Sequence, residues 1–243
     1  MKKLWHRLLV LFLSLLLMVM VLTGYFVARG YNRYIQAIRE TPVEEAVANY
    51  PFGERIRFNQ LSPAFVYAVV AVEDQRYFYR RGFDWVALFR AIINNLVAHR
   101  AVEGASTIGQ QVAKNLYFQG GRRGLEEKLA EVFLMNELEN QYSKEEVLAL
   151  YVSMNYYGDG LWGIAQASKG YYQTSPAELD YAHAAMLAGI PNAPSYYQLS
   201  TGYEQAVRRQ RKVLSRMKEE GYISEQEYEE ALLVDVHPVP EGN

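Results

Sequence analysis

The chain contains no cysteine among its 243 residues, which excludes disulfide bonds, thiolate metal sites and a cysteine nucleophile. Histidine is scarce, and the four that occur lie too far apart in the sequence to form a local metal-binding motif. With 27 acidic and 25 basic residues, the formal net charge of -2 provides no overall positive field for nucleic acid. An anionic ligand would therefore have to be bound by local clusters of basic residues.

A long apolar run lies near the N-terminus. Residues 8–28 carry no charge, and at about 1.5 Å per helical residue this length can cross a hydrocarbon core of roughly 30 Å. No small-residue cleavage site follows, so we expect an uncleaved transmembrane anchor within residues 1–30 and not a signal peptide. Three lysine or arginine residues precede the run and two follow it closely, a slight bias that favours an N-terminus inside. We therefore expect a single-pass protein of a cell membrane with its main domain on the extracytoplasmic side.

The rest of the chain is expected to form one globular unit, since half of all residues are hydrophobic. Residues 31–53 are predicted to be a stalk or linker with a helical piece, residues 54–235 a single domain, and residues 236–243 a tail. Strand-like alternation is scarce, so the fold is predicted to be mainly α-helical. Helical patterns cover residues 85–97, 125–139, 144–154, 176–188, 203–219 and 225–233.

One carboxylate stands at the end of an apolar helix. Ser62 followed by Pro63 predicts a helix start, and the apolar run 65–72 then leads to Glu73 and Asp74. A carboxylate sheltered by such neighbours has a raised pKa, which suits a general base. The alternative is an ordinary helix-end carboxylate in solvent.

A glycine-containing segment follows at residues 104–111, GASTIGQQ. Gly104 and Gly109 have the spacing of a phosphate-binding loop, but Gln110 and Gln111 stand where that loop requires lysine and serine or threonine. A nucleotide is therefore not expected.

Basic and acidic residues come next in the chain. Lys114, Arg122 and Arg123 lie in one short segment that could bind an anion, although solvated loop charge is the simpler interpretation. Glu131 shares a predicted helix face with Glu127, which in isolation indicates an ordinary solvated face.

Five segments occur in an order that resembles the peptidoglycan glycosyltransferase family, the polymerising domain also found in bifunctional penicillin-binding proteins. The second segment matches the family pattern at every diagnostic position. The resemblance implies a lysozyme-like, two-lobed helical fold and the polymerisation of a lipid-linked disaccharide-peptide, lipid II, with release of lipid diphosphate. The segments are AVEDQRYFYRRG (71–82), GASTIGQQVAKN (104–115), EEKLAE (126–131), YVSMNYYGDGLWGIAQAS (151–168) and AAMLAGIPNAPSYY (184–197).

The resemblance also implies roles for particular residues. Glu73 matches the glutamate that removes the proton from the acceptor sugar's 4-hydroxyl, and Glu131 matches a second catalytic glutamate near the diphosphate. A divalent metal ion at the diphosphate is the one cofactor that it leaves open, and other cell-wall synthesis proteins are candidate partners besides lipid II and the growing glycan. Substrate binding is assigned to Asp74, Ser106, Thr107, Gln110, Gln111, Lys114, Asn115, Arg122, Arg123 and Lys128.

The sequence departs from the family pattern at five positions: Tyr77 for phenylalanine, Arg80 for histidine, Glu127 for arginine, Ser153 for asparagine and His183 for glutamate. Glu127 is the most serious departure, because it places an anion near the expected diphosphate site, where Arg80 could supply a compensating charge.

Two other functions stay open at this point. A glycan-cleaving muramidase would use a protonated Glu73 as its acid, and a catalytically impaired scaffold would bind lipid II without turnover. The apolar helix at residues 85–97 is interpreted either as core or as a second membrane contact. Ser215 to Lys218 match a transpeptidase motif formally, but no Lys-Thr-Gly segment follows, so we expect a monofunctional protein.

Overall fold

The computed structural model describes residues 2–51, 54–80, 82, 106–119 and 124–239. Within these ranges the chain forms α-helices and short 3-10 helices (η), and its only bridge of β type pairs Tyr156 with Trp162. The prediction of a mainly α fold is confirmed. The elements are α1 (Lys2–Glu40), α2 (Val43–Asn49), η1 (Phe58–Gln60), α3 (Pro63–Glu73), α5 (Ile108–Tyr117), α6 (Leu125–Gln141), α7 (Lys144–Met154), α8 (Gly163–Tyr172), η2 (Pro176–Glu178), α9 (Tyr181–Gly189), η3 (Ile190–Asn192), α10 (Pro194–Tyr197), α11 (Tyr203–Glu219) and α12 (Glu225–Leu233).

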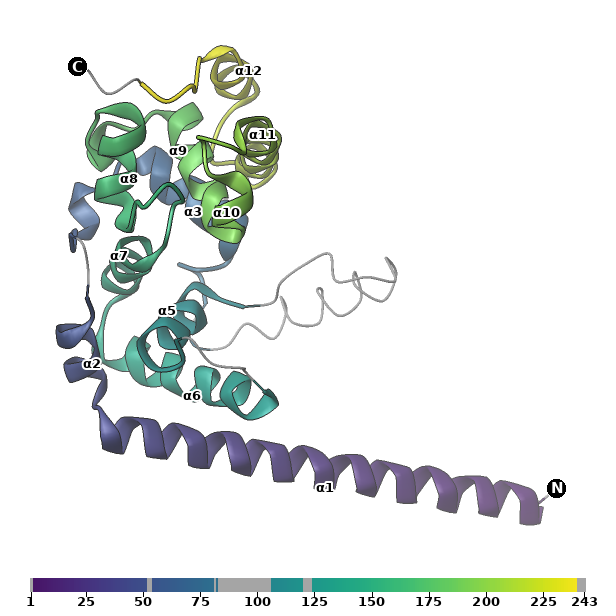
Figure 1. Cartoon of the computed structure of the whole chain (residues 1–243). Coiled ribbons are helices and arrows are strands. Elements are labelled where there is room, and N and C mark those ends of the chain that lie inside the picture. Colours follow the sequence, from purple (N-terminus) through teal and green to yellow (C-terminus); the bar gives the residue numbers. More distant parts are fainter. Residues whose placement is uncertain (1, 52–53, 81, 83–105, 120–123, 240–243) are drawn as a thin grey trace.

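The N-terminal helix α1 includes the predicted membrane anchor and continues without a break to Glu40. Of the described helices it alone is long and apolar enough to cross a membrane, and its most apolar stretch is not buried against the protein. Figure 1 shows its N-terminal half projecting away from the other helices, while its C-terminal part lies along α6. Pro42 ends α1, because proline lacks the N–H group that a helix interior requires, and α2 begins directly after it.

Helix α3 begins as predicted. The Ser62 hydroxyl accepts the N–H of Phe65 at 3.1 Å, and Pro63 occupies the first helical position. The helix is apolar and almost wholly buried, and it packs against α9 and α11. Its last residue is Glu73, so the packing of α3 determines where this carboxylate lies.

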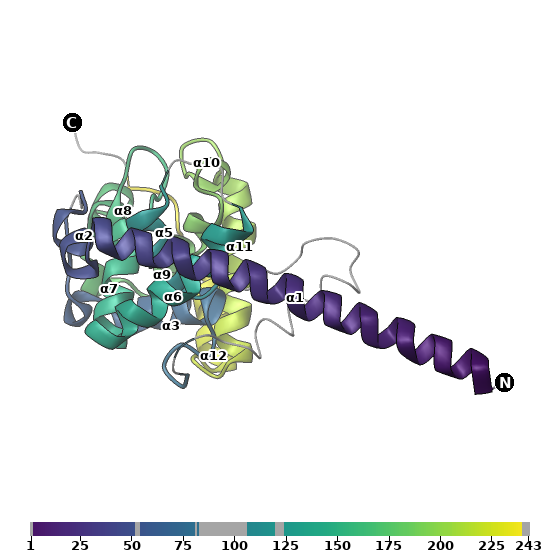
Figure 2. The same cartoon turned by 90° about the horizontal axis from the view of Figure 1, so that it is seen from below.

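The helices form two groups that α7 connects (Figure 1). One group contains α3 and α8 to α12, and the other contains α5 and α6 with α1 and α2. Most buried side chains belong to one core, and a smaller cluster joins Ala37 of α1, Ala113 of α5 and Leu134 of α6. The second view, from below, shows α1 passing across α5 and α6 (Figure 2). The C-terminal part of α1 is therefore packed as part of the domain and is not a separate stalk.

Some sequence expectations differ from the structure. The helix expected over residues 176–188 is divided into η2 and α9, because the Asp180 side chain accepts the N–H of His183 and starts a new helix. Helices α5 and α8 were not predicted; each contains glycine, which disfavours a helix interior. The pattern at residues 85–97 lies outside the described residues.

Candidate active site

Glu73 lies at the C-terminal end of α3, where it faces α5. Its Oε2 accepts a hydrogen bond from Nε2 of Gln111 at 2.7 Å. Burial raises the pKa of the Glu73 carboxyl, while Gln111, the charge of Arg209 and the Tyr151 hydroxyl act in the opposite direction. The predicted sheltered carboxylate is therefore present, and the groups around it prevent its pKa from rising further.

Tyr151 and Tyr157 form the buried wall beside Glu73. Burial, followed by the nearby Glu73 charge, raises the pKa of both phenols above the ordinary value. Both hydroxyls thus stay protonated at neutral pH. Tyr151 can therefore donate a hydrogen bond to the Glu73 carboxylate.

Asp74 turns away from Glu73 into a buried ionic network. Arg80 donates to its two oxygens, from Nη2 at 2.5 Å and from Nε at 3.3 Å, and the N–H of Ile108 adds a bond of 3.2 Å. Glu139 and Lys144 extend the network, with 2.7 Å between Lys144 Nζ and Glu139 Oε1. Asp74 thus holds the start of α5 against the end of α3, and its roles in orienting neighbouring groups and in binding substrate stay predictions.

Arg80 does not supply free positive charge. Its side chain is almost completely buried, and its guanidinium group pairs with Asp74 and approaches Glu139. The expectation that Arg80 could compensate for Glu127 at a diphosphate is therefore wrong, because both ends of that guanidinium group already face protein carboxylates.

Glu131 is buried on the side of α6 that packs against α5. The expectation of a solvated face is wrong for Glu131, which is buried, although Lys128 on the same face stays exposed. Nζ of Lys128 donates to Glu131 Oε2 at 2.9 Å and to the Ser106 hydroxyl at 2.7 Å. The Lys128 side chain remains nearly half exposed, so its ammonium group is held by protein and still meets solvent.

The start of α5 uses two predicted substrate residues as its cap. Thr107 Oγ1 accepts the N–H of Gln110, and Gln110 Oε1 accepts the N–H of Thr107. Both side chains are buried, so they hold the turn that places Gln111 beside Glu73. Lys114 lies one turn further along α5, and Arg122 and Arg123 lie outside the described residues.

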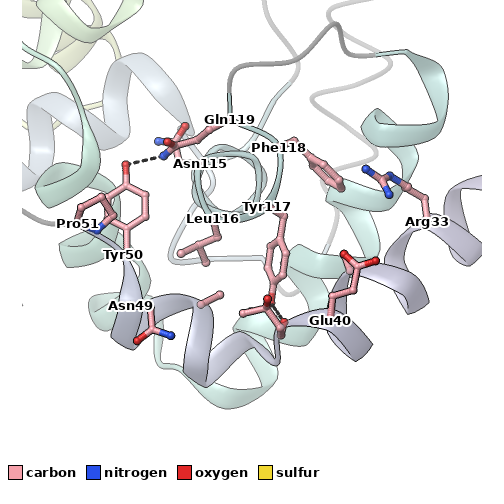
Figure 3. A pocket seen from close by; sticks show the side chains of 13 residues that line it. Arg33, Glu40, Asn49, Tyr50, Pro51, Asn115, Leu116, Tyr117, Phe118 and Gln119 are labelled. Carbon is pink, nitrogen blue, oxygen red and sulfur yellow. Dashed lines mark hydrogen bonds between the residues drawn. The ribbon is translucent and has the colours of Figure 1, made fainter.

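A cavity of about 410 Å³ lies between the ends of α1 and α5 and helix α2. Figure 3 shows Asn115 and Gln119 on one side of it, with the Gln119 amide donating to the Tyr50 hydroxyl at 2.9 Å. Asn115 is the one predicted site residue that lines it, and Glu73 does not. The cavity thus touches the candidate site only at its edge.

Glu127 has partners that point away from Glu131. It accepts the N–H of Gly124 at 2.8 Å, closing the first turn of α6, and lies 3.8 Å from Nε of Arg33 in α1. The N–H groups of Glu127 and Gly124 lower the pKa of the Glu127 carboxyl. Glu127 therefore belongs to the contact between α6 and the anchor helix.

The other departures from the family pattern are also satisfied within the protein. The added Tyr77 hydroxyl donates to the Lys144 carbonyl at 2.7 Å, and Ser153 donates to the Ala149 carbonyl at 2.7 Å. His183 pairs with Asp180 through Nδ1 at 2.8 Å.

Sequence reasoning missed Arg209 on α11. Its charge lowers the pKa of Glu73, and its Nε is buried without a hydrogen-bond partner in the described part of the chain. Its side chain lies over Gly189, where a Cβ would approach Arg209 Cγ to 2.8 Å. Helical spacing contained a signal, since residues 206, 209 and 213 share the buried side of α11.

The described side chains near Glu131 do not match a metal site. Among the described residues, no group of three histidine or acidic side chains is placed to hold a metal ion. The neighbour of Glu131 is the cationic Lys128, which would repel a divalent ion. The residues described around Glu131 therefore do not fit a divalent metal ion.

These features together describe a helical domain that carries a sheltered carboxylate and a helix of membrane-spanning length. The family model described as transglycosylase matches residues 40–218, well over half of the chain, and the chain belongs to this family. The resemblance inferred from five segments is thereby confirmed, and with it the mainly α, lysozyme-like fold class.

Several penicillin-binding proteins are similar to the chain. Penicillin-binding protein 1A of Aquifex aeolicus (strain VF5) is 38% identical, covering 73% of this chain and 24% of that protein. The corresponding values are 37%, 76% and 22% for penicillin-binding protein 1A of Escherichia coli (strain K12), and 36%, 74% and 26% for penicillin-binding protein 2D of Bacillus subtilis (strain 168). A crystal structure of penicillin-binding protein 1A from Haemophilus influenzae superposes with a TM-score of 0.38 at 26% identity, covering 55% of this chain and 17% of that one. The chain thus spans about a quarter of the length of the curated relatives it matches.

Proposed function

We propose that the protein polymerises lipid II into peptidoglycan strands by inverting glycosyl transfer. The observation that carries this proposal is the carboxylate of Glu73. It is sheltered enough for a raised pKa, yet held in place by Gln111 at 2.7 Å. Membership of the transglycosylase family supplies the reaction class, and the membrane-length helix α1 suits a substrate that stays in the membrane.

In the proposed step, Glu73 removes the proton from the 4-hydroxyl of the acceptor lipid II. The oxygen then forms a bond to the anomeric carbon of the growing chain on the face opposite the diphosphate. The bond from that carbon to the diphosphate oxygen breaks, and its electron pair leaves with the lipid diphosphate. The configuration at the anomeric carbon inverts from α to β, and Glu73 ends the step protonated.

The leaving diphosphate gains negative charge, which cations can stabilise. Lys128 suits this role because Glu131 and Ser106 hold its ammonium group while part of it meets solvent. Lys114, with Arg122 and Arg123, completes the set proposed from the sequence. Glu131 would act by fixing Lys128 rather than by touching the diphosphate.

The orientation in the membrane is part of the same proposal. Arg29 and Arg33, which follow the apolar run, pair with Glu126 and Glu127 of α6. Their charges are therefore partly neutralised, whereas the lysines at the N-terminus lie beyond the domain. This difference supports an N-terminus in the cytoplasm and a catalytic domain outside it.

The test is to incubate the full-length protein with labelled lipid II and to separate the products by length. Polymer formation by the wild type supports the proposal, cleavage of added finished glycan indicates a muramidase, and neither product indicates a scaffold. Glu73→Gln should reduce polymerisation about 100-fold or more, because the amide keeps the shape but cannot accept a proton. Glu145→Gln, an exposed carboxylate on α7, is the matched control. A Glu73→Gln protein that folds, binds lipid II and polymerises at nearly the wild-type rate would exclude Glu73 as the base.

A further inference from the structure

Two charged pairs connect the anchor helix α1 with α6. Arg29 donates to both oxygens of Glu126, from Nε at 2.9 Å and from Nη2 at 3.1 Å. One turn further along, Arg33 approaches Glu127. Pairs this exposed add little stability, but two in succession specify which turn of α1 lies against which turn of α6.

Between these pairs, the two helices touch at Gly30. A Cβ on Gly30 would lie 2.4 Å from Cβ of Leu129, a distance too short for two carbon atoms that are not bonded to each other. It would also lie 3.4 Å from the backbone N of Ala130. Gly24, in the same helix, has nothing within 4 Å of its own Cβ position. Glycine is therefore needed at position 30 for close helix contact, and position 24 carries no such requirement.

Aromatic side chains continue the contact. The Phe133 ring lies 5.4 Å from Tyr31 and 5.8 Å from Tyr34, and the Tyr34 hydroxyl donates to Glu137 Oε2 at 3.3 Å. Contacts thus advance along both helices in the same direction, so α1 and α6 run parallel, as Figure 1 also shows. These residues define the contact surface of α1 and α6, which extends from the first turn of α6 to Glu137.

This arrangement relates the membrane boundary to the candidate site. Arg29 is the first charge after the apolar run, so it marks the edge of the hydrocarbon core. Glu126 lies beside it, and Lys128 and Glu131 follow two and five residues later on α6. At 1.5 Å per residue they stand about 3 Å and 7.5 Å further from the membrane.

We propose that the contact surface of α1 and α6 fixes the height of the candidate site above the membrane, with Gly30 as the positioning residue. It holds the Lys128 and Glu131 pair at the height where the diphosphate of a membrane-embedded polyprenyl lipid emerges. The anchor is then a rigid part of the catalytic domain and not a tether. This inference rests on the proposed function, because it assumes a substrate whose diphosphate lies at the membrane surface.

The test compares Gly30→Leu with Gly24→Leu in the full-length protein. Both changes replace glycine by a better helix former in the same helix, but only the first should separate α1 from α6. With a long-chain polyprenyl diphosphate disaccharide in vesicles, Gly30→Leu should lose about tenfold to 100-fold in turnover, as expected for misplaced catalytic groups. With a short-chain analogue in detergent, where height no longer matters, it should stay near the wild-type rate. Gly24→Leu should resemble the wild type in both.

Distances measured in the same vesicles provide a readout that does not depend on activity. Because the chain lacks cysteine, Asn32→Cys and Asn140→Cys would introduce a single pair of spin labels at exposed positions of α1 and α6. The wild-type background should give a narrow distance distribution, and Gly30→Leu a broad one.

A Gly30→Leu protein with a broad distance distribution and full turnover in vesicles would overturn the proposal that the contact surface fixes the height of the site. A broad distribution in the wild type would overturn the rigid contact itself. If the labels show a narrow distance distribution but the wild type makes no polymer from either substrate, the proposed function is refuted. The height-fixing role of the contact surface, which rests on that function, is then refuted as well.

Discussion

The hydrogen bond between Gln111 and Glu73 makes a quantitative prediction about pH dependence. Gln111→Met keeps the approximate length of the side chain but removes the donor 2.7 Å from Glu73 Oε2. A hydrogen bond to a charged group is worth about 1.5–3 kcal/mol, and a tenfold change in ionisation corresponds to about 1.4 kcal/mol. The Tyr151 hydroxyl and the Arg209 charge remain and can compensate in part.

The Gln111 amide favours the charged form of the Glu73 carboxylate. Its removal therefore raises the pKa of Glu73 further and leaves less of the active base near neutral pH. We expect the acid limb of kcat/KM to move upward by about one pH unit, with a smaller loss of rate at high pH. The assay is lipid II polymerisation measured from pH 5 to pH 9, with Gln119→Met, two turns further along the chain, as control. A Gln111→Met protein whose rate falls equally at every pH would show that Gln111 acts on the substrate and not on Glu73.

Two further predictions concern the departures from the family. Glu127→Arg should not raise the polymerisation rate, and it should lower stability by about 1–2 kcal/mol, because it removes the bond to the Gly124 N–H and opposes Arg33. A several-fold gain in rate would show instead that position 127 acts on the diphosphate. Arg80→Ala leaves the buried Asp74 carboxylate unpaired, so it should cost about 3–5 kcal/mol and lower Tm by roughly 6 °C or more, measured by circular dichroism in detergent. An unchanged Tm would mean that the pair contributes nothing.

Several elements could be predicted because their signals are local. Ser62 with Pro63 marks the start of α3, and the predicted bounds of α7, α11 and α12 agree with the structure. Helix α5 was missed even though Thr107 and Gln110 form a capping box. Gly109 disfavours a helix interior, but the apolar residues Ile108, Val112 and Ala113 share one buried face, so the helical spacing was a signal beside the capping box.

The candidate site also combines features that the sequence predicts with features that it does not. The apolar helix α3 predicted a sheltered Glu73, but the groups that enclose the carboxylate come from other elements, such as Tyr151 and Tyr157. The burial of Glu131 was not predicted, because it depends on how α5 and α1 pack against α6, and α1 lies far from α6 in the sequence. Arg209 reaches Glu73 from 136 residues away (209 minus 73), and Arg33 reaches Glu127 from the anchor.

Neighbouring residues determine the helix starts, the membrane-length run and the order of the polar motifs. The sequence alone therefore predicted these features and the family. The partners of charges that lie far apart in the sequence were decided only when the helices packed. Glu127 meets Arg33 of α1, which a linear pattern does not place beside it, whereas Arg80 pairs with Asp74 six residues away, in the turn after α3. The same two residues that looked like a lost and a regained phosphate contact are, in the folded protein, a link to the anchor and a support for Asp74.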